Sequence, residues 1–155
     1  MNYETIVSNA VRRAVTLGEK LAAPRVSDLP FVSASMGSKI ELEGFEENKE
    51  GKIIGDMARQ AVLNIFNRHF SVSQMDQLAA QFKNGFGIEV SDMMPAKKYT
   101  ASLQKNTVFA DTVKKITKSE QPEILASAVE FILEGLYVNN KLNKTSSGGK
   151  NIYRN

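Results

Sequence analysis

Glycines close to a lysine are the first place to look for nucleotide chemistry in this sequence. A phosphate-binding loop has the spacing G-x-x-x-x-G-K-[ST], in which backbone N–H groups surround the phosphates and the lysine contacts the terminal ones. The nearest pattern, Gly148-Gly149-Lys150, lacks the first glycine and is followed by Asn151. Gly85 and Gly87 form a G-x-G pair, but no strand is predicted before it and no third glycine follows. Both patterns predict loops, so we expect no catalytic residue and no bound cofactor in this chain.

Residues that could bind a metal ion or act as a nucleophile are few. The chain has no cysteine and one histidine, His69, which excludes a zinc site built from thiolates or imidazoles. We expect His69 to flank the core. Glu41, Glu43, Glu46 and Glu47 are interpreted as a solvated acidic loop, since the alternative, a hard-cation site, lacks calcium-loop spacing. Without a G-x-S-x-G elbow a hydrolase is also unsupported. We expect no metal site, and no enzymatic activity from this chain alone.

Two adjacent arginines, Arg12 and Arg13, remain as candidates for a binding role. They lie in a predicted amphipathic helix, and the favoured interpretation places both on its polar face. The alternative is functional: a guanidinium would reach toward a phosphate or an acidic group of another domain.

The bulk composition is that of an ordinary globular protein. Hydrophobic residues make up 42% of the chain, which is long enough for one domain or for two small helical subdomains. The net charge is only +3, and Lys and Arg are interleaved with acidic residues until the last dozen positions, so nucleic-acid binding is disfavoured. The longest apolar run, residues 124–138, contains Glu130 and Glu134 and is too short to span a bilayer. We expect a cytoplasmic protein without membrane attachment.

The first half of the chain is predicted to be mainly helical. Its first segment shows apolar residues at helical spacing and should end at Gly18. That apolar stripe consists of Tyr3, Ile6, Val7, Ala10, Ala14 and Leu17. Ser27 or Asp28 is expected to cap a short helix running toward Met36. Residues 39–43 alternate like a strand, and the polar residues 44–51 are the best candidate for a subdomain boundary.

The second half begins with the clearest helix, whose two adjoining apolar rows predict a broad buried face. These rows are formed by Ile53, Ile54, Met57, Ala58, Ala61, Val62, Ile65 and Phe66. Further helices are expected after Ser71 or Ser73, and near Pro95, Thr107 and Pro122. The helix that starts at Pro122 should be the central one of this half. Residues 88–90 are expected to form a short extended element at most. The tail is disordered by composition, so deleting residues 145–155 should leave the melting temperature nearly unchanged.

These elements together predict a mainly α fold. We expect a multi-helix bundle that can divide into two small helical subdomains and contains at most a short β-hairpin. The division places a helical segment at residues 1–43, a C-terminal helical domain at 52–143 and a disordered tail at 144–155.

Several stretches, in order along most of the chain, resemble the C-terminal region of magnesium-chelatase-like AAA+ ATPases. Residues 2–10 (NYETIVSNA), Arg12-Arg13-Ala14, Gly18-Glu19 and residues 24–29 (PRVSDL) resemble the lid of these ATPases. Residues 126–136 (ASAVEFILEGL) and 140–144 (NKLNK) resemble their last helix, and residues 37–43, 87–92 and 94–95 also fit. One departure is Val11, because the family typically has an acidic residue there.

The resemblance implies that this chain is the lid and C-terminal helical extension of a larger ATPase. The first helix starts at the second residue, which suggests that the ATPase core lies upstream. ATP and magnesium would then belong to that parent protein, and this chain would be a non-catalytic module that couples the ATPase ring to oligomerisation or to a partner protein. Because such lids supply a nucleotide-sensing arginine, Arg12 and Arg13 are the cofactor-binding candidates. The expected partners are the upstream ATPase domain or neighbouring ring subunits, and an unidentified protein.

Two alternatives remain open on the sequence. One is a free-standing helical adaptor that binds a protein partner through its long C-terminal helix. The other is a weak nucleic-acid-binding module that uses Lys141, Lys144, Lys150 and Arg154.

Overall fold

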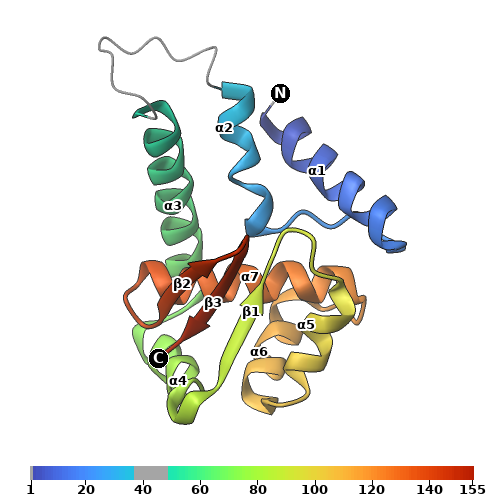
Figure 1. The fold of residues 1–155 in the computed structure, drawn as a ribbon. Coiled ribbons are helices and arrows are strands. Elements are labelled where there is room, and N and C mark those ends of the chain that lie inside the picture. Colours follow the sequence, from blue (N-terminus) through green and yellow to red (C-terminus); the bar gives the residue numbers. More distant parts are fainter. Residues whose placement is uncertain (1, 37–48) are drawn as a thin grey trace.

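The computed structural model describes residues 2–36 and 49–155, which fold into seven α-helices, two short 3-10 helices and three strands (Figure 1). The elements are α1 (Asn2–Leu17), η1 (Val26–Asp28), α2 (Phe31–Met36), α3 (Lys49–His69), α4 (Val72–Ala80), η2 (Lys83–Gly85), β1 (Gly87–Val90), α5 (Ala96–Leu103), α6 (Thr107–Thr117), α7 (Pro122–Val138), β2 (Asn143–Ser147) and β3 (Lys150–Arg154). The predicted mainly α, multi-helix fold is confirmed. The strand-like stretch 39–43 lies outside the described residues, as does most of the boundary at 44–51, whose last three residues belong to α3.

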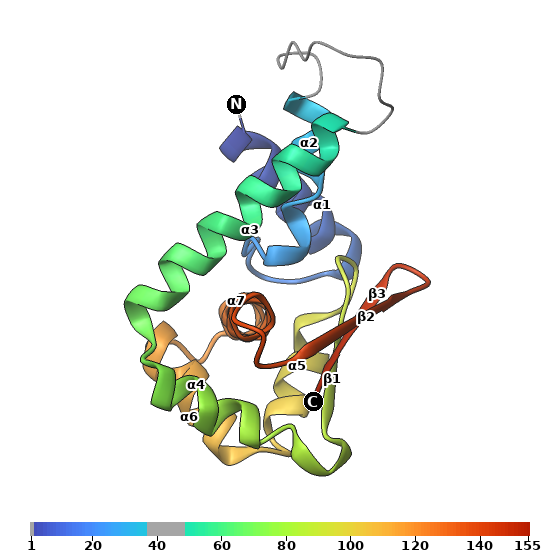
Figure 2. The same cartoon turned by 90° about the vertical axis from the view of Figure 1, so that its left-hand side faces the viewer.

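Helix α7 is the central element. Pro122 lies in its first turn, as predicted, where a proline is preferred because it has no N–H to satisfy. Buried residues occur on most sides of α7, since α3, α5 and α6 pack along it and η1 contacts it as well. Figure 2 views α7 nearly end-on, with α1 and α2 above it and α4 and α6 below it. Among the described helices, none combines the length and the apolar character that crossing a membrane requires.

Gly135 sets the distance between α7 and α3. A Cβ atom at this position would lie 2.1 Å from Cδ2 of Phe66, far inside contact distance. The Phe66 ring is fully buried and stacks on Phe70 with the ring centroids 4.4 Å apart. A side chain at position 135 would push α3 away from α7, because a close-packed interior has no room for one more carbon.

The broad buried face predicted for α3 is only half correct. Ile54, Val62 and Phe66 are buried, but Met57 is 61% exposed and Ile65 is 48% exposed. Helix α3 packs on α7 and α2, which cover one side of it. The second apolar row therefore faces outward, and the sequence contains no signal for which row the neighbours cover.

Helix ends follow local signals in most places. Gly18 has a φ of 65° and terminates α1, and Ser71 caps α4 by accepting the N–H of Gln74. Helix α6 is capped by Asn106 rather than by Thr107, through a 3.0 Å bond from the N–H of Phe109. The cap expected from Ser27 or Asp28 on α2 is wrong, because these residues lie at η1 and their side chains bind elsewhere.

The predicted disordered tail is wrong: residues 143–154 form a hairpin. Strand β3 lies between β1 and β2 and is antiparallel to both. Gly148 and Gly149 have φ values of 57° and 76°, as the two-residue turn requires. Tyr153 is buried opposite Ile88, which fixes the register against β1. The fold thus contains a three-stranded sheet, one strand more than the expected hairpin.

Candidate functional site

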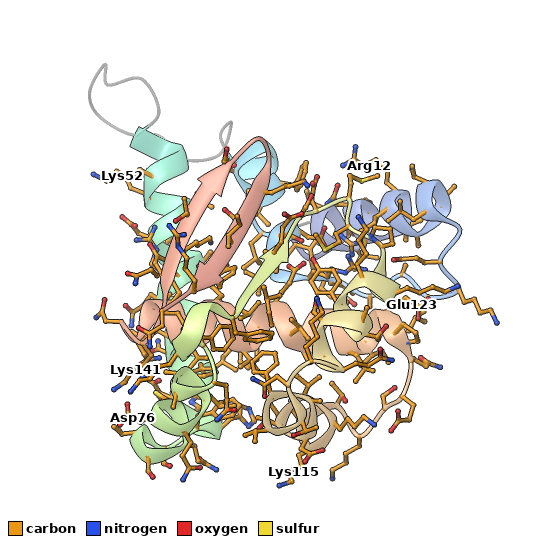
Figure 3. All side chains as sticks on the ribbon, turned by 60° about the horizontal axis from the view of Figure 1, so that its bottom comes forward. Arg12, Lys52, Asp76, Lys115, Glu123 and Lys141 are labelled. Atoms are coloured by element: carbon orange, nitrogen blue, oxygen red, sulfur yellow. The ribbon has the colours of Figure 1, made fainter. Side chains whose placement is uncertain are left out.

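Arg12 and Arg13 lie in different environments although they are adjacent. Consecutive side chains on a helix point about 100° apart. Arg13 is buried, whereas Arg12, labelled in Figure 3, is exposed. Arg12 donates a 2.7 Å hydrogen bond from Nη2 to Oδ1 of Asn9, and its guanidinium lies 5.5 Å from the centroid of the Phe31 ring. Arg12 therefore matches the polar-face interpretation, whereas Arg13 does not.

Arg13 is only 1% exposed and forms an ion pair with Asp28 of η1. Its Nη1 lies 2.6 Å from Oδ1 and its Nη2 3.1 Å from Oδ2, and Nη2 also donates to the carbonyl of Ala23. The same carboxylate accepts hydrogen bonds from Asn9 and from the backbone N–H of Arg25. A bidentate pair with this many supporting bonds holds the segment after α1 in one position. In this fold Arg13 faces the interior and not an outside nucleotide.

Arg25 continues the polar cluster toward α5. Its Nη1 donates to the carbonyl of Met94 at 2.6 Å, and its Nη2 lies 3.2 Å from Oε1 of Glu19. The guanidinium also lies 5.1 Å from the ring centroid of Tyr99, a cation–π contact. Glu19 in turn accepts the N–H of Ala96, the first residue of α5, at 2.7 Å. Arg25 and Glu19 therefore connect the chain after α1 to the start of α5.

Glu130 connects the same segment to α7. Its carboxylate accepts the Tyr99 hydroxyl at 2.5 Å, the Ser27 N–H at 2.7 Å and the Ser27 hydroxyl at 3.2 Å. Burial raises the pKa of Glu130, and these hydrogen bonds lower it only in part. Burial, reinforced by the Glu130 charge, also raises the pKa of Tyr99, so the phenol remains a donor. We call Arg13, Arg25, Asp28, Tyr99 and Glu130 the N-terminal junction.

A second polar cluster, one helical turn further along α7, attaches the hairpin. Glu134 accepts a short hydrogen bond from the Tyr153 hydroxyl and pairs with Lys144 at 2.8 Å. The Lys144 ammonium lies 5.4 Å from the Tyr137 ring centroid and 5.3 Å from that of Tyr153. Burial raises the pKa of Tyr153, and the nearby Glu134 charge raises it further. We call Glu134, Lys144 and Tyr153 the C-terminal junction.

Sequence reasoning did not single out Glu130 and Glu134 as functional residues, although a signal was present. They stand four residues apart in the most apolar helix, which places both on one face. Charged residues are rarely buried unless they are paired. The pattern therefore indicated buried partners, but it contained nothing that identified Tyr99 or Tyr153 as those partners.

The contacts of the two junctions hold segments of the chain together. Their carboxylates accept hydrogen bonds from distant parts of the fold, as does the neighbouring Glu19. Among the described residues, no cluster of three or more His, Asp or Glu side chains could hold a metal ion. The acidic stretch with Glu41, Glu43, Glu46 and Glu47 lies outside the described residues. His69 is exposed at the end of α3 and does not flank the core as expected.

The four cations of the alternative nucleic-acid-binding module, Lys141, Lys144, Lys150 and Arg154, are mostly paired with acidic residues. Lys141 lies 2.6 Å from Asp76, a pair labelled in Figure 3, and Lys144 is bound to Glu134. Lys150 lies 2.9 Å from Glu89. Three of the four charges are therefore compensated within the fold, which reduces their attraction for phosphates.

No protein-family model matches the chain, and neither a curated protein nor a solved structure matches it.

Proposed function

We propose that this chain is a non-catalytic helical module of a magnesium-chelatase-like AAA+ ATPase, which couples the ATPase to oligomerisation or to a partner protein. The observation that carries the proposal is the N-terminal junction. The buried Arg13–Asp28 pair fixes α1 to η1. The Ser27–Glu130 bond then joins η1 to α7, and Arg25 joins the same segment to Met94 just before α5. A displacement imposed on α1 would therefore be passed to α7.

The rigidity of this connection follows from the chemistry of buried charges. Removing one partner of a buried ion pair typically costs about 3–5 kcal/mol, because the other charge is left without compensation. Separating α1 from η1 would break the Arg13–Asp28 pair in this way. A module that transmits the nucleotide state of an ATPase needs such a connection, because a loosely attached α1 would move without displacing the other helices.

The outer face of α1 is the surface we assign to the ATPase. Val11 and Val15 are one turn apart and exposed, and Tyr3 is exposed two turns before Val11. Arg12 lies beside them and is also exposed. In this proposal ATP and magnesium belong to the ATPase core. Arg12 would be the nucleotide-sensing arginine, and Arg13 would hold α1 in position.

The test uses an ATPase core encoded in frame upstream of, or in a gene beside, the sequence of this chain. We expect such a phosphate-loop gene, and we expect its product to bind the wild-type chain in size-exclusion chromatography. Val15→Asp should abolish binding, whereas Val72→Asp, an exposed valine on α4, should not. A genome without such a gene, or binding that survives Val15→Asp, contradicts the proposal. So does tight ATP binding by the isolated chain in calorimetry.

A second candidate function is the free-standing adaptor. The expected binding through the long C-terminal helix is wrong, because α7 is buried among α3, α5 and α6. One observation on another helix favours an adaptor. The outward row of α3 exposes Met57, Ala61 and Ile65, a surface that a protein partner could cover. This adaptor would bind its partner equally well with and without ATP and magnesium. For the module of an ATPase, partner binding should change when ATP and magnesium are added to the ATPase core.

A further inference from the structure

A groove of about 670 Å³ lies at the end of the molecule away from α1. Helix α6 forms one wall, and the end of α3 together with α4 forms the other. Figure 2 shows α4 and α6 side by side below α7, whereas α1 and α2 lie above it. The volume is within the range of about 300–1,000 Å³ that ligand sites in proteins occupy.

The α6 wall presents aliphatic side chains to solvent. Val108 is 46% exposed and Ile116 is 38% exposed, and both line the groove. Because they are eight residues apart on one helix, they are separated by about 12 Å along its axis. A ligand that covers both must be that long. Helical segments that bind in grooves place their apolar anchors at such distances.

Positive charge gathers at the same wall. Lys115 and Lys118 line the groove at the C-terminal end of α6, and Figure 3 shows Lys115 at the edge of the molecule. Neither forms an ion pair with a residue that the structure describes, whereas their neighbour Lys114 lies 3.3 Å from Glu120. Asp111 is the single acidic residue of the lining.

The distribution of charge along the chain strengthens this observation. Residues 96–118 contain one acidic residue, Asp111, and several lysines. These lysines are Lys97, Lys98, Lys105, Lys114, Lys115 and Lys118. The whole chain has 20 Lys and Arg against 17 Asp and Glu, so outside this segment the acidic residues outnumber the basic ones. The excess positive charge of the protein is therefore concentrated in the segment that contains α5 and α6.

We propose that this groove binds an acidic amphipathic helix of a protein partner. Its apolar side chains would cover Val108 and Ile116, and its carboxylates would pair with Lys115 and Lys118. A nucleic-acid backbone fits less well, because its phosphates make no use of the aliphatic wall formed by Val108 and Ile116. The inference goes beyond the proposed function, since the contact with the ATPase is assigned to α1 at the opposite end.

The probe is a fluorescein-labelled peptide of about 18 residues, five helical turns, with leucines along one face and glutamates elsewhere. A peptide of the same composition with its leucines spread around the helix is the first control, and a DNA duplex is the second. We expect saturable binding of the amphipathic peptide in fluorescence anisotropy. Its affinity should fall as salt concentration rises, because the lysines contribute by charge.

Two variants locate the binding to the groove. Lys115→Glu combined with Lys118→Glu should weaken binding by about tenfold or more and flatten its salt dependence. Val108→Asp should weaken it as well, and an acidic residue is tolerated there because position 108 lies in the first turn of α6. The matched controls, Lys52→Glu on α3 and Val15→Asp on α1, are exposed residues outside the groove and should leave binding unchanged.

Melting temperatures of all variants are measured alongside, because Lys115 and Lys118 also stabilise the end of α6 through its dipole. The proposal is overturned if the amphipathic peptide does not bind, if the control peptide binds equally well, or if DNA binds more tightly than either. Binding that the groove variants leave intact while they remain folded also overturns it.

Discussion

The two junctions on α7 attach opposite ends of the chain by different means. In the N-terminal junction Glu130 is held by neutral donors, Tyr99 and Ser27, and is 2% exposed. In the C-terminal junction Glu134 is held by one neutral donor, Tyr153, and by the charged Lys144, which remains partly exposed. One helical turn separates the two carboxylates, and burial raises the pKa of Glu130, to which no cation bonds directly.

The two junctions therefore depend on burial and on charge to different extents. In the N-terminal junction the Arg13–Asp28 ion pair joins α1 to η1 and does not involve α7. This junction contacts α7 through hydrogen bonds to Glu130 instead. The C-terminal junction combines its ion pair with a buried aromatic ring in one place. The first should therefore depend on pH and on each donor, and the second mainly on the packing of Tyr153.

Deleting residues 145–155 should destabilise the protein more than any single substitution in either junction. It removes the buried ring of Tyr153 and the partner strand of β1. Loss of a buried aromatic side chain costs about 3–5 kcal/mol, which corresponds to a fall in melting temperature on the order of 10 °C for a domain of this size. Thermal unfolding followed by circular dichroism measures it. An unchanged melting temperature would mean that the hairpin is not docked in solution.

Arg13→Ala should destabilise the protein by about 3–5 kcal/mol, because it leaves the buried Asp28 carboxylate without its cation. Arg12→Ala is the matched control on the neighbouring position and should cost less than about 1 kcal/mol, the range of an exposed cation–π contact. Urea unfolding provides both values. Equal effects of the two substitutions would contradict the assignment of Arg13 to the interior.

Tyr99→Phe and Tyr153→Phe test the two junctions with the same change, the loss of one hydroxyl. Tyr99→Phe should cost about 1–3 kcal/mol, since Glu130 loses its shortest hydrogen bond. Tyr153→Phe should cost about 0.5–1.5 kcal/mol, because Lys144 remains 2.8 Å from the same oxygen of Glu134. Chemical denaturation of both variants measures the two losses in unfolding free energy. A larger loss for Tyr153→Phe than for Tyr99→Phe would contradict the proposed difference between the junctions.

Glu130→Gln should change how stability depends on pH. The pKa of Glu130 is raised in the folded state above its ordinary value of 4.5, so the folded protein binds this proton more tightly. That contribution is fully present below the unfolded pKa and is lost as pH rises through the folded pKa. Relative to wild type, Glu130→Gln should therefore gain stability as pH rises from about 4.5, by about 1.4 kcal/mol for each unit of elevation. Parallel stability curves between pH 4.5 and 8 would exclude this linkage.

Much of the helical framework was predictable because its signals are local. Pro122 starts α7, Gly18 ends α1 and Ser71 caps α4 by contacts within a few residues of chain. The candidate site was predictable only as a pair of arginines, Arg12 and Arg13. Which of the two faces inward depends on the position of Asp28, and the helix alone does not determine that.

The sequence by itself determined the mainly helical fold, the central role of the helix that starts at Pro122, and the absence of cysteine chemistry. Periodicity and capping act over one or two turns, so a single sequence contains them in full. Only the tertiary structure decided that residues 143–154 form strands, that the Met57 row of α3 stays exposed, and that Glu130 and Glu134 are buried. Each of these outcomes depends on a neighbour distant in the chain: β1 for the hairpin, α2 and α7 for α3, and Tyr99 and Tyr153 for the two carboxylates.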